Sequence, residues 1–524
     1  MHIIRLASGA HDAGLPSYHA SAGDTRARLN PVVAASSVCR HWNAALRDSP
    51  TVWSTLRLDG QFVGRRIQAK VRWWVAKATA TALPSEEQED EFPPGDPRFA
   101  PGPEPARRTR AGLGVAAIVL TRAQNLGEHG LRTLLDLLVS LDGVPALRSL
   151  HISWMGPAST SALAQHQIKA TFAFLSRRAS STLESFTLHT PSHLRILFSL
   201  PRFGHHFTAL RALELRAARP ATRADNLYVP PDVLPPYEGE DDWPPTRITR
   251  LALVGPVWRL KFEDGLLGSP TVAKEDCPEL EELELAETKP PVGWDLLSAP
   301  GLRTVLLSDH LDQPTLPDPK VSQSLARVER LGLVRSAPLA TRLLNLAVAQ
   351  NVTFHHLTSV NLRSATVSSA QLALFAASSA PNLRELHLAN TAAVQLPGIL
   401  QPVLALPACP NVAVLDVSAA AWLEGSIDQL GAAMPGLERV NMSGTEVGSR
   451  AVLEFVQCTL EEVVGEGGRA SAWSRLAELN LVGCGKLEAR AVEWLRARVR
   501  PGGFRYAMVR GDEDKRLARY GGQW

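Results

Sequence analysis

The chain has 524 residues, 45% of them hydrophobic, and its 55 basic and 52 acidic side chains leave a formal net charge of +3. A chain of this length is able to bury about three quarters of its surface. The near-neutral charge excludes a global field that would recruit nucleic acid or anionic lipid, so we expect neither as a partner. Five widely spaced cysteines suit reduced thiols, and the N-terminal residues lack an apolar stretch of signal-peptide length. Together these features predict a cytoplasmic or nuclear protein.

The N-terminal part of the chain begins with residues 1–30, which we leave unassigned and expect to be poorly ordered. Residues 31–60 then indicate a helix, a turn marked by proline, and a strand. Val38 and Trp42 are four residues apart and so lie on one face of the helix. The strand carries alternating apolar residues, which suit it to capping the apolar end of a sheet: Trp53, Leu56 and Leu58.

This N-terminal segment resembles the second half of an F-box, in which a V-C-[RK]-x-W helix is followed by a D-x-P-x-L-W turn and then a strand. The matching positions, in order, are Val38, Cys39, Arg40, Trp42, Asp48, Pro50 and Trp53. The resemblance implies that an adaptor of the Skp type, and through it a cullin ligase, is bound by Val38, Cys39, Trp42, Pro50 and Trp53. The first half of the box is not matched, because Leu15 and Pro16 are followed by SYHASAGDTRARLN, which has no apolar helical face. A simple capping unit would use the same residues.

Two further segments precede the main body of the chain. Residues 61–83 predict a basic amphipathic helix with two tryptophans, which could touch membrane or nucleic acid. We favour a helix that bridges the F-box-like unit and the following array, a layout similar to that of fungal-type F-box proteins with repeats. Residues 84–112 are rich in proline and charge with almost nothing to bury, which predicts a disordered linker.

The main body, residues 113–499, repeats the phrase Leu-x-x-Leu-x-Leu with conservative substitutions, at intervals of 22 residues (Leu280 to Leu302) to 39 (Leu437 to Leu476). The thirteen copies open at Val115, Leu147, Leu183, Leu210, Ile248, Leu280, Leu302, Val328, Leu357, Leu383, Val412, Leu437 and Leu476. One copy is a short strand with nothing to pack against, whereas stacked copies share a continuous core. The pattern resembles the leucine-rich repeat family, and residues 500–524 would form a tail.

The segments between the strands show apolar residues three or four apart, which predicts helical returns at 131–141, 167–179, 338–350, 449–457 and 488–499. Strand followed by helix, repeated, predicts an α/β solenoid with a curved parallel sheet and helices on its convex side. At the final position of the repeat we expect a hydrogen-bonding ladder only locally, at Thr288, Thr445 and Cys484.

One long insertion interrupts the array at residues 219–247. Its three aromatic residues, Tyr228, Tyr237 and Trp243, would serve as a partner-binding patch, although we favour a solvated loop that tucks them against the solenoid.

Strand residues between the consensus leucines point away from the core and should form rows across the concave face. The central row is Val119, His151, Thr187, Glu214, Ala252, Glu284, Leu306, Gly332, Asn361, His387, Asp416, Asn441 and Asn480. It is polar from Asn361 onward, and we expect these side chains to face solvent. The predicted partner-binding residues are Asn361, Arg363, His387, Asp416, Arg439, Asn441 and Asn480.

Signatures of catalysis are weak throughout the chain. GLGVAA at 112–117 mimics a dinucleotide fingerprint but opens a strand instead of a helix, which removes the phosphate site. Adjacent histidine pairs without a C-x-x-C do not build a zinc site. We therefore expect no catalytic residue, no metal, no cofactor and no enzymatic activity. The F-box resemblance implies a substrate-recognition subunit of an SCF-type E3 ubiquitin ligase, and the alternative is a free-standing leucine-rich-repeat scaffold for protein interactions.

Overall fold

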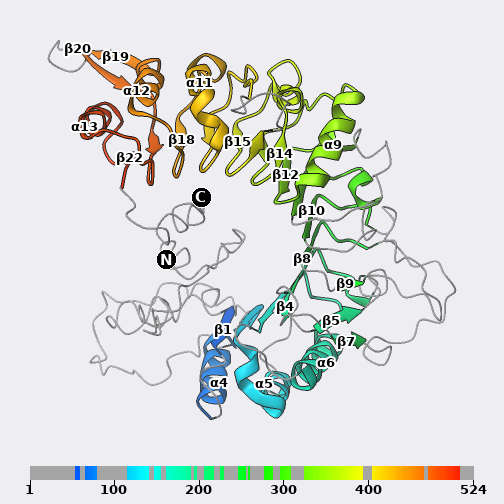
Figure 1. Ribbon diagram of the computed structural model, residues 1–524. Helices are drawn as coiled ribbons and strands as arrows, with labels where there is room; N and C mark the ends of the chain where they lie inside the picture. Colours follow the sequence, from blue (N-terminus) through cyan, green and yellow to red (C-terminus); the bar gives the residue numbers. More distant parts are fainter. Residues whose placement is uncertain are drawn as a thin grey trace, which may run out of the picture. The chain divides into compact units, whose positions relative to one another are not determined.

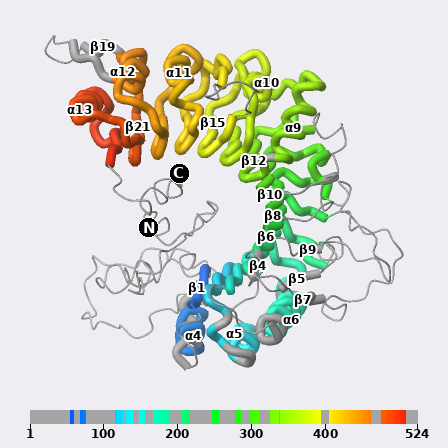
Figure 2. Tube along the Cα trace, in the orientation of Figure 1, coloured from blue at the N-terminus to red at the C-terminus, as the bar shows by residue number. Residues whose placement is uncertain are grey.

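The fold is described from a computed structural model (Figures 1 and 2), which divides into two compact units. The first unit comprises residues 1–196 and 202–243, and the second comprises 197–201 and 244–524. The structure describes residues 54–59, 65–79, 115–140, 147–154, 161–190, 194–197, 204, 206–217, 225–228, 246–254, 258–259, 277–286, 295–308, 324–393, 404–464 and 470–507.

The first unit is built on parallel strands in the order β1, β2, β3, β4 and β6. These strands are β1 Thr55–Asp59, β2 Ala117–Thr121, β3 Ser149–Ser153, β4 Ser185–Thr190 and β6 Ala212–Ala217. The returns between them include helix α4 Arg65–Thr79, η3 Ala123–Leu126, α5 Gly127–Ser140 and α6 Ser161–Arg178. Two short strands, β5 Leu194–Leu197 and β7 Asp225–Tyr228, are neighbours in a separate small sheet.

The second unit continues the same design with parallel strands in the order β8, β10, β11, β12, β13, β15, β17, β18, β21 and β22. These are β8 Arg250–Val254, β10 Glu282–Ala286, β11 Thr304–Ser308, β12 Arg330–Val334, β13 Ser359–Asn361, β15 Glu385–His387, β17 Val414–Asp416, β18 Arg439–Asn441, β21 Glu478–Asn480 and β22 Phe504–Arg505. The returns are η5 Asp295–Ser298, α9 Ala337–Ala349, α10 Ser369–Leu372, η6 Ala373–Phe375, η7 Ala421–Gly425, α11 Ile427–Ala433, α12 Ser449–Gln457 and α13 Ala489–Arg498. The remaining short strands are β9 Trp258–Arg259, the parallel pair β14 Thr366–Val367 and β16 Ala392–Ala393, and the antiparallel hairpin β19 Leu460–Val464 and β20 Ala470–Ser474.

All thirteen predicted strands are present, which confirms the α/β leucine-rich-repeat class. The first apolar residue of every copy is buried, with no more than 3% of its surface exposed. The last copy shows the packing clearly, since Leu476, Leu479 and Leu481 are each 0% exposed. Two further strands, β1 and β22, join the same long parallel sheet. β1 forms within the capping segment and buries Leu56 and Leu58, as predicted, and β22 lies inside the stretch that was expected to be a tail.

The five predicted helical returns correspond to α5, α6, α9, α12 and α13. In the second unit, Figure 1 shows α9, α11 and α12 on one side of the strands. The length of each return follows the spacing of the repeats. The 22-residue step from Leu280 leaves room only for the four-residue η5, whereas α6 has 18 residues in a 36-residue step from Leu147. The longest step, from Leu437, accommodates the β19–β20 hairpin as well as α12.

The turn that follows each strand also repeats. A left-handed backbone stands at the third residue after the strand in Ser364, Asn390, Ala419, Gly444 and Gly483, and directly after the longer strands β2 and β12 in Arg122 and Arg335. In the second unit the N–H of this residue donates to the next turn, as from Ala419 to the Ser443 carbonyl at 2.8 Å and from Gly444 to the Val482 carbonyl at 2.8 Å. At the final repeat position, Thr445 and Cys484 both donate to the Met442 carbonyl, as the sequence predicts. Thr391 does the same to Leu388, and Thr288 lies outside the described residues.

We predict that Gly444→Ala lowers the free energy of unfolding by about 1 kcal/mol. A Cβ in the left-handed region costs roughly 1–2 kcal/mol, of which the lower entropy of the unfolded alanine chain returns a part. Ala419→Gly, at the equivalent turn with φ 53°, should raise the unfolding free energy for the opposite reason. Denaturant unfolding measures both. Ala432→Gly, exposed on helix α11, is the control and should be destabilising by about 1 kcal/mol. Equal effects of the two Ala→Gly changes would contradict the prediction.

Candidate protein-binding face

The open face of the second unit is the side of its strands opposite the buried leucines. Five neighbouring strands place Asn361, His387, Asp416, Asn441 and Asn480 in consecutive register on this face. We call these residues the polar row. The alternation of the leucine phrase predicted the row correctly, because side chains of a strand point to opposite sides in turn and a parallel register keeps equivalent positions adjacent.

All five members of the polar row stand at the end of a strand, and four of them accept a hydrogen bond from the backbone N–H two residues further on. The pairs are Asn361 Oδ1 with Arg363 N at 3.1 Å, Asp416 Oδ1 with Ser418 N at 3.1 Å, Asn441 Oδ1 with Ser443 N at 3.2 Å, and Asn480 Oδ1 with Val482 N at 3.2 Å. Asparagine and aspartate commonly close turns in this way. These side-chain oxygens are therefore engaged in hydrogen bonds that close the turns.

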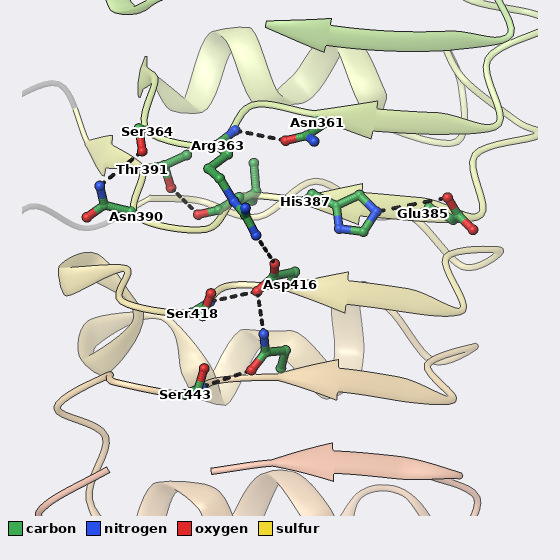
Figure 3. A network of polar contacts seen from close by, with 12 residues as sticks. Asn361, Arg363, Ser364, Glu385, His387, Asn390, Thr391, Asp416, Ser418 and Ser443 are labelled. Atoms are coloured by element: carbon green, nitrogen blue, oxygen red, sulfur yellow. Dashed lines mark hydrogen bonds and ion pairs between the residues drawn. The ribbon is translucent and has the colours of Figure 1, made fainter. Parts of the chain in front are cut away.

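The centre of the row is a network of three side chains (Figure 3). Asn441 Nδ2 donates to Asp416 Oδ1 at 3.0 Å, and Arg363 Nη2 lies 3.5 Å from Asp416 Oδ2. Asp416 and Asn441 are only 3% and 4% exposed. The expectation that they face solvent is wrong, because neighbouring repeats are close enough for their side chains to satisfy one another and exclude water. The exposed part of the network is Arg363, whose side chain is 39% exposed.

His387 is half-buried in the row. Burial lowers its pKa, and the guanidinium of Arg363 adds to this effect, whereas the carboxylates of Asp416 and Glu385 oppose it. Its Nε2 lies 3.9 Å from Glu385 Oε2, on the same strand. Arg439, the remaining predicted residue, is exposed at the start of β18 and stands beside the row.

The polar row ends beside Asn361, where the next two equivalent positions carry no polar side chain: Gly332 on β12 and Leu306 on β11. Beyond them, the half-buried Glu284 on β10 and then Ala252 on β8 occupy the same position. Leu306 fills the space above Gly332, where an added Cβ would lie 2.4 Å from Leu306 Cδ1. This leucine and glycine pair marks the limit of the polar surface beside Asn361.

The first unit carries a second polar cluster on the face of its strands away from the leucines. Arg216 donates to Glu214 Oε1, His189 Nε2 lies 3.4 Å from the same oxygen, and the rings of His151 and His189 meet edge to face with centroids 4.8 Å apart. Burial raises the pKa of Glu214, but the hydrogen bonds and charges of His189 and Arg216 outweigh it and hold the value at about 2. Burial and His189 lower the pKa of His151 to about 4 against the opposing charge of Glu214. His189 was not among the residues predicted from the sequence, although its position two residues after Thr187 places it on the same face.

Among the described residues, Ser153, Cys409 and Cys484 show no sign of activation as nucleophiles. Ser153 Oγ, next to His189 in register, has no hydrogen-bond partner, so no base activates it. Burial raises the pKa of the Cys409 thiol to about 12 and also raises that of Cys484, which keeps both protonated. Within the part of the chain that the structure describes, no group of three histidine, cysteine or acidic residues could hold a metal ion.

The adaptor-binding residues predicted from the F-box resemblance lie outside the described residues: Val38, Cys39, Trp42, Pro50 and Trp53. The predicted linker 84–112 and most of the insertion 219–247 are outside as well. The bridging helix is observed as α4, and its predicted apolar side is buried, with Trp74 1% exposed and Val71 0%. No helix among the described residues has the length and apolar character needed to cross a membrane.

Comparison with protein-family models gives no match, and comparison with curated proteins gives no significant one. Among solved structures, an internalin from Listeria monocytogenes is similar with 11% identity, covering 75% of this chain and 96% of that chain at a TM-score of 0.30. The Toll–Spatzle complex of Drosophila is similar with 13% identity, covering 64% of this chain and 47% of that chain at a TM-score of 0.24. At these TM-scores, function has to be argued from the site itself.

We predict that Asp416→Ala lowers the unfolding free energy by roughly 2–3 kcal/mol, because it leaves buried donors of Asn441 and Ser418 without an acceptor. Arg439→Ala removes an exposed side chain and should change it by less than about 0.5 kcal/mol. Denaturant unfolding of the two variants separates the buried part of the site from the exposed part. Equal and small effects would show that the Asp416 network does not stabilise the fold.

A second prediction concerns acid. An unfolded His151 takes up a proton near pH 6.5, whereas the folded residue, with a pKa of about 4, does not. Its contribution to stability is therefore complete above pH 6.5 and is lost as the pH falls toward 4. Between pH 7 and pH 5 this amounts to roughly 1–2 kcal/mol, and His151→Gln should reduce the pH dependence of unfolding by that amount. Wild type and variant losing equal stability over this interval would contradict the prediction.

Proposed function

We propose that this chain binds a protein partner through the open face of its second unit. The observation that carries the proposal is the polar row itself. Its side chains come from five neighbouring strands, and four of the five are held by turn hydrogen bonds, two of them also by the Asp416 network, before any partner binds. A rigid set of polar groups loses little conformational entropy on binding, which favours affinity and specificity.

Binding without catalysis is the proposed activity. The serine and cysteines described above lack an activating base, and the ionic clusters are satisfied internally, so the surface suits recognition. The near-neutral net charge supports a protein partner in preference to nucleic acid or a membrane. Location in the cytoplasm or nucleus remains part of this proposal, and the buried, reduced thiols Cys277, Cys409 and Cys484 support it.

A more specific form of the proposal is that the chain is the substrate-recognition subunit of an SCF-type ubiquitin ligase. Its support is the resemblance of residues 31–60 to the second half of an F-box, together with β1 at the end of this segment, which pairs with β2, the first strand of the repeat array. In that role the N-terminal segment would hold a Skp-type adaptor while the open face holds the target. The alternative is a free-standing scaffold whose N-terminal segment only caps the core.

The binding proposal is tested by cross-linking partners to the full chain in cells and comparing variants. Arg363→Gln combined with Arg439→Glu alters the exposed cations of the face, keeps the buried pair Asp416 and Asn441, and should lose the partners. The control, Arg490→Glu combined with Arg496→Glu on the exposed side of α13, should keep them. Partners that remain bound to the first variant would place recognition elsewhere, with the 219–247 insertion as the next candidate.

The ligase form is tested separately with a purified Skp-type adaptor. Co-elution with the wild-type chain and loss of co-elution with Trp42→Ala are the expected results. Failure of the wild type to bind the adaptor would favour the free-standing scaffold. A loss of adaptor binding with retained target binding would show that the two regions act independently.

A further inference from the structure

The hydrogen bonds of the polar row determine which of its atoms face outward. Only the oxygen of an amide side chain accepts a hydrogen bond from a backbone N–H, so the turn contacts of Asn361 and Asn480 direct their oxygens inward. The amide NH₂ groups of both side chains then have no partner among the described residues. These two half-buried residues mark the two ends of the row, and each presents a donor there.

In the middle of the row, the acceptor oxygens of Asp416 are likewise engaged in contacts within the protein. Asp416 Oδ1 accepts from Ser418 N and from Asn441 Nδ2, and Asp416 Oδ2 faces Arg363. The carboxylate side chain is 4% exposed, whereas the side chain of Arg363 that pairs with it is 39% exposed. The negative charge is thus buried and the positive charge is presented.

The charged residues beside the row show the same arrangement, with the cation more exposed than the neighbouring acid. Arg439 is exposed and has no ionic partner among the described residues, whereas the neighbouring Glu478 is paired with Arg505 at 2.9 Å and only 15% exposed. Glu385, with 45% of its side chain exposed, is the acidic exception, and it lies close to His387. The accessible groups of the face are therefore mainly hydrogen-bond donors and cations.

We propose that this face binds an extended acidic segment of a protein partner, whose carboxylates and main-chain carbonyls accept hydrogen bonds from Asn361, Arg363, Arg439 and Asn480. The inference rests on the proposed function and adds the chemistry of the partner. Asn361 and Asn480 are four strand spacings apart, roughly 19 Å, which an extended segment of about six residues spans. A nucleic acid is less suited, because its phosphates require a continuous basic surface and Glu385 interrupts this one.

The probe for the test is a displayed library of random linear twelve-residue peptides, selected on the full chain. The selected peptides should be enriched several-fold in Asp and Glu over the input, and their binding should weaken as salt is raised. The decisive variant is Asn361→Asp combined with Asn480→Asp. Aspartate keeps the oxygen that closes the turn, as Asp416 already does at the same position, and replaces the outward NH₂ by a second oxygen. It should weaken the selected peptides at least tenfold at an unchanged melting temperature.

Two controls separate the donor from the added charge. Asn345→Asp combined with Gln457→Glu adds the same charge on helices α9 and α12 and should leave peptide binding within twofold. Asn361→Ser combined with Asn480→Ser keeps a short acceptor for the turn, removes the NH₂ groups and adds no charge. It should also weaken the acidic peptides, and this variant decides the matter if the aspartate variant proves unstable.

The outcomes distinguish this inference from the function on which it rests. Selected peptides that are neutral or basic, yet lose binding in the Asn361 and Asn480 variants, would overturn the acidic partner and leave the binding face in place. Peptides that bind all variants equally would overturn both the acidic partner and the assignment of the binding site to this face. A twenty-residue oligothymidylate that binds the chain as tightly as the selected peptides, and depends on the same asparagines, would replace the acidic protein segment with nucleic acid.

Discussion

The parallel register between successive repeats is the constraint on which the rest of the structure depends. Each strand pairs in register with its neighbour in the same unit, so equivalent residues stand side by side. Because side chains alternate along a strand, a slip of one residue would move the leucines to the open face and the polar row into the core. The buried leucines hold the register, and the register in turn assembles the polar row from residues that are far apart in the sequence.

The fold was largely predictable because the leucine phrase reports burial directly. Each of its three apolar positions points into the core, and that requirement is visible in every copy. The strand at Phe504–Arg505 was not predictable, because it pairs over only two residues and no leucine phrase marks it. The short returns such as η5 were also missed, since repeat spacing, more than helical periodicity, determines what fits there.

The site was predictable in position but not in chemistry. Strand alternation located the polar row, yet it treated Asp416 and Asn441 as solvent-facing side chains when they are buried. Each of these side chains is held by the turn that follows its strand, and the sequence partly marks that turn. An asparagine followed three residues later by glycine occurs at Asn441 with Gly444 and at Asn480 with Gly483, where the glycine takes the left-handed backbone that lets the turn close on the side chain. The mutual contact of Asp416 with Arg363 has no such local signal, because it joins different repeats.

The central claim is that the polar row is fixed by its own turns before a partner binds. This preorganisation is tested by amide hydrogen exchange at single-residue resolution on the chain alone. The informative backbone N–H groups are those that donate to the side chains of the row: Arg363, Ser418, Ser443 and Val482. These N–H groups lie beyond the ends of the strands, and we expect them to be protected to nearly the same degree as the ladder amides of Leu362 and Val417. Exchange at the rate of an exposed loop would show that the turns are open and that the row is not preorganised.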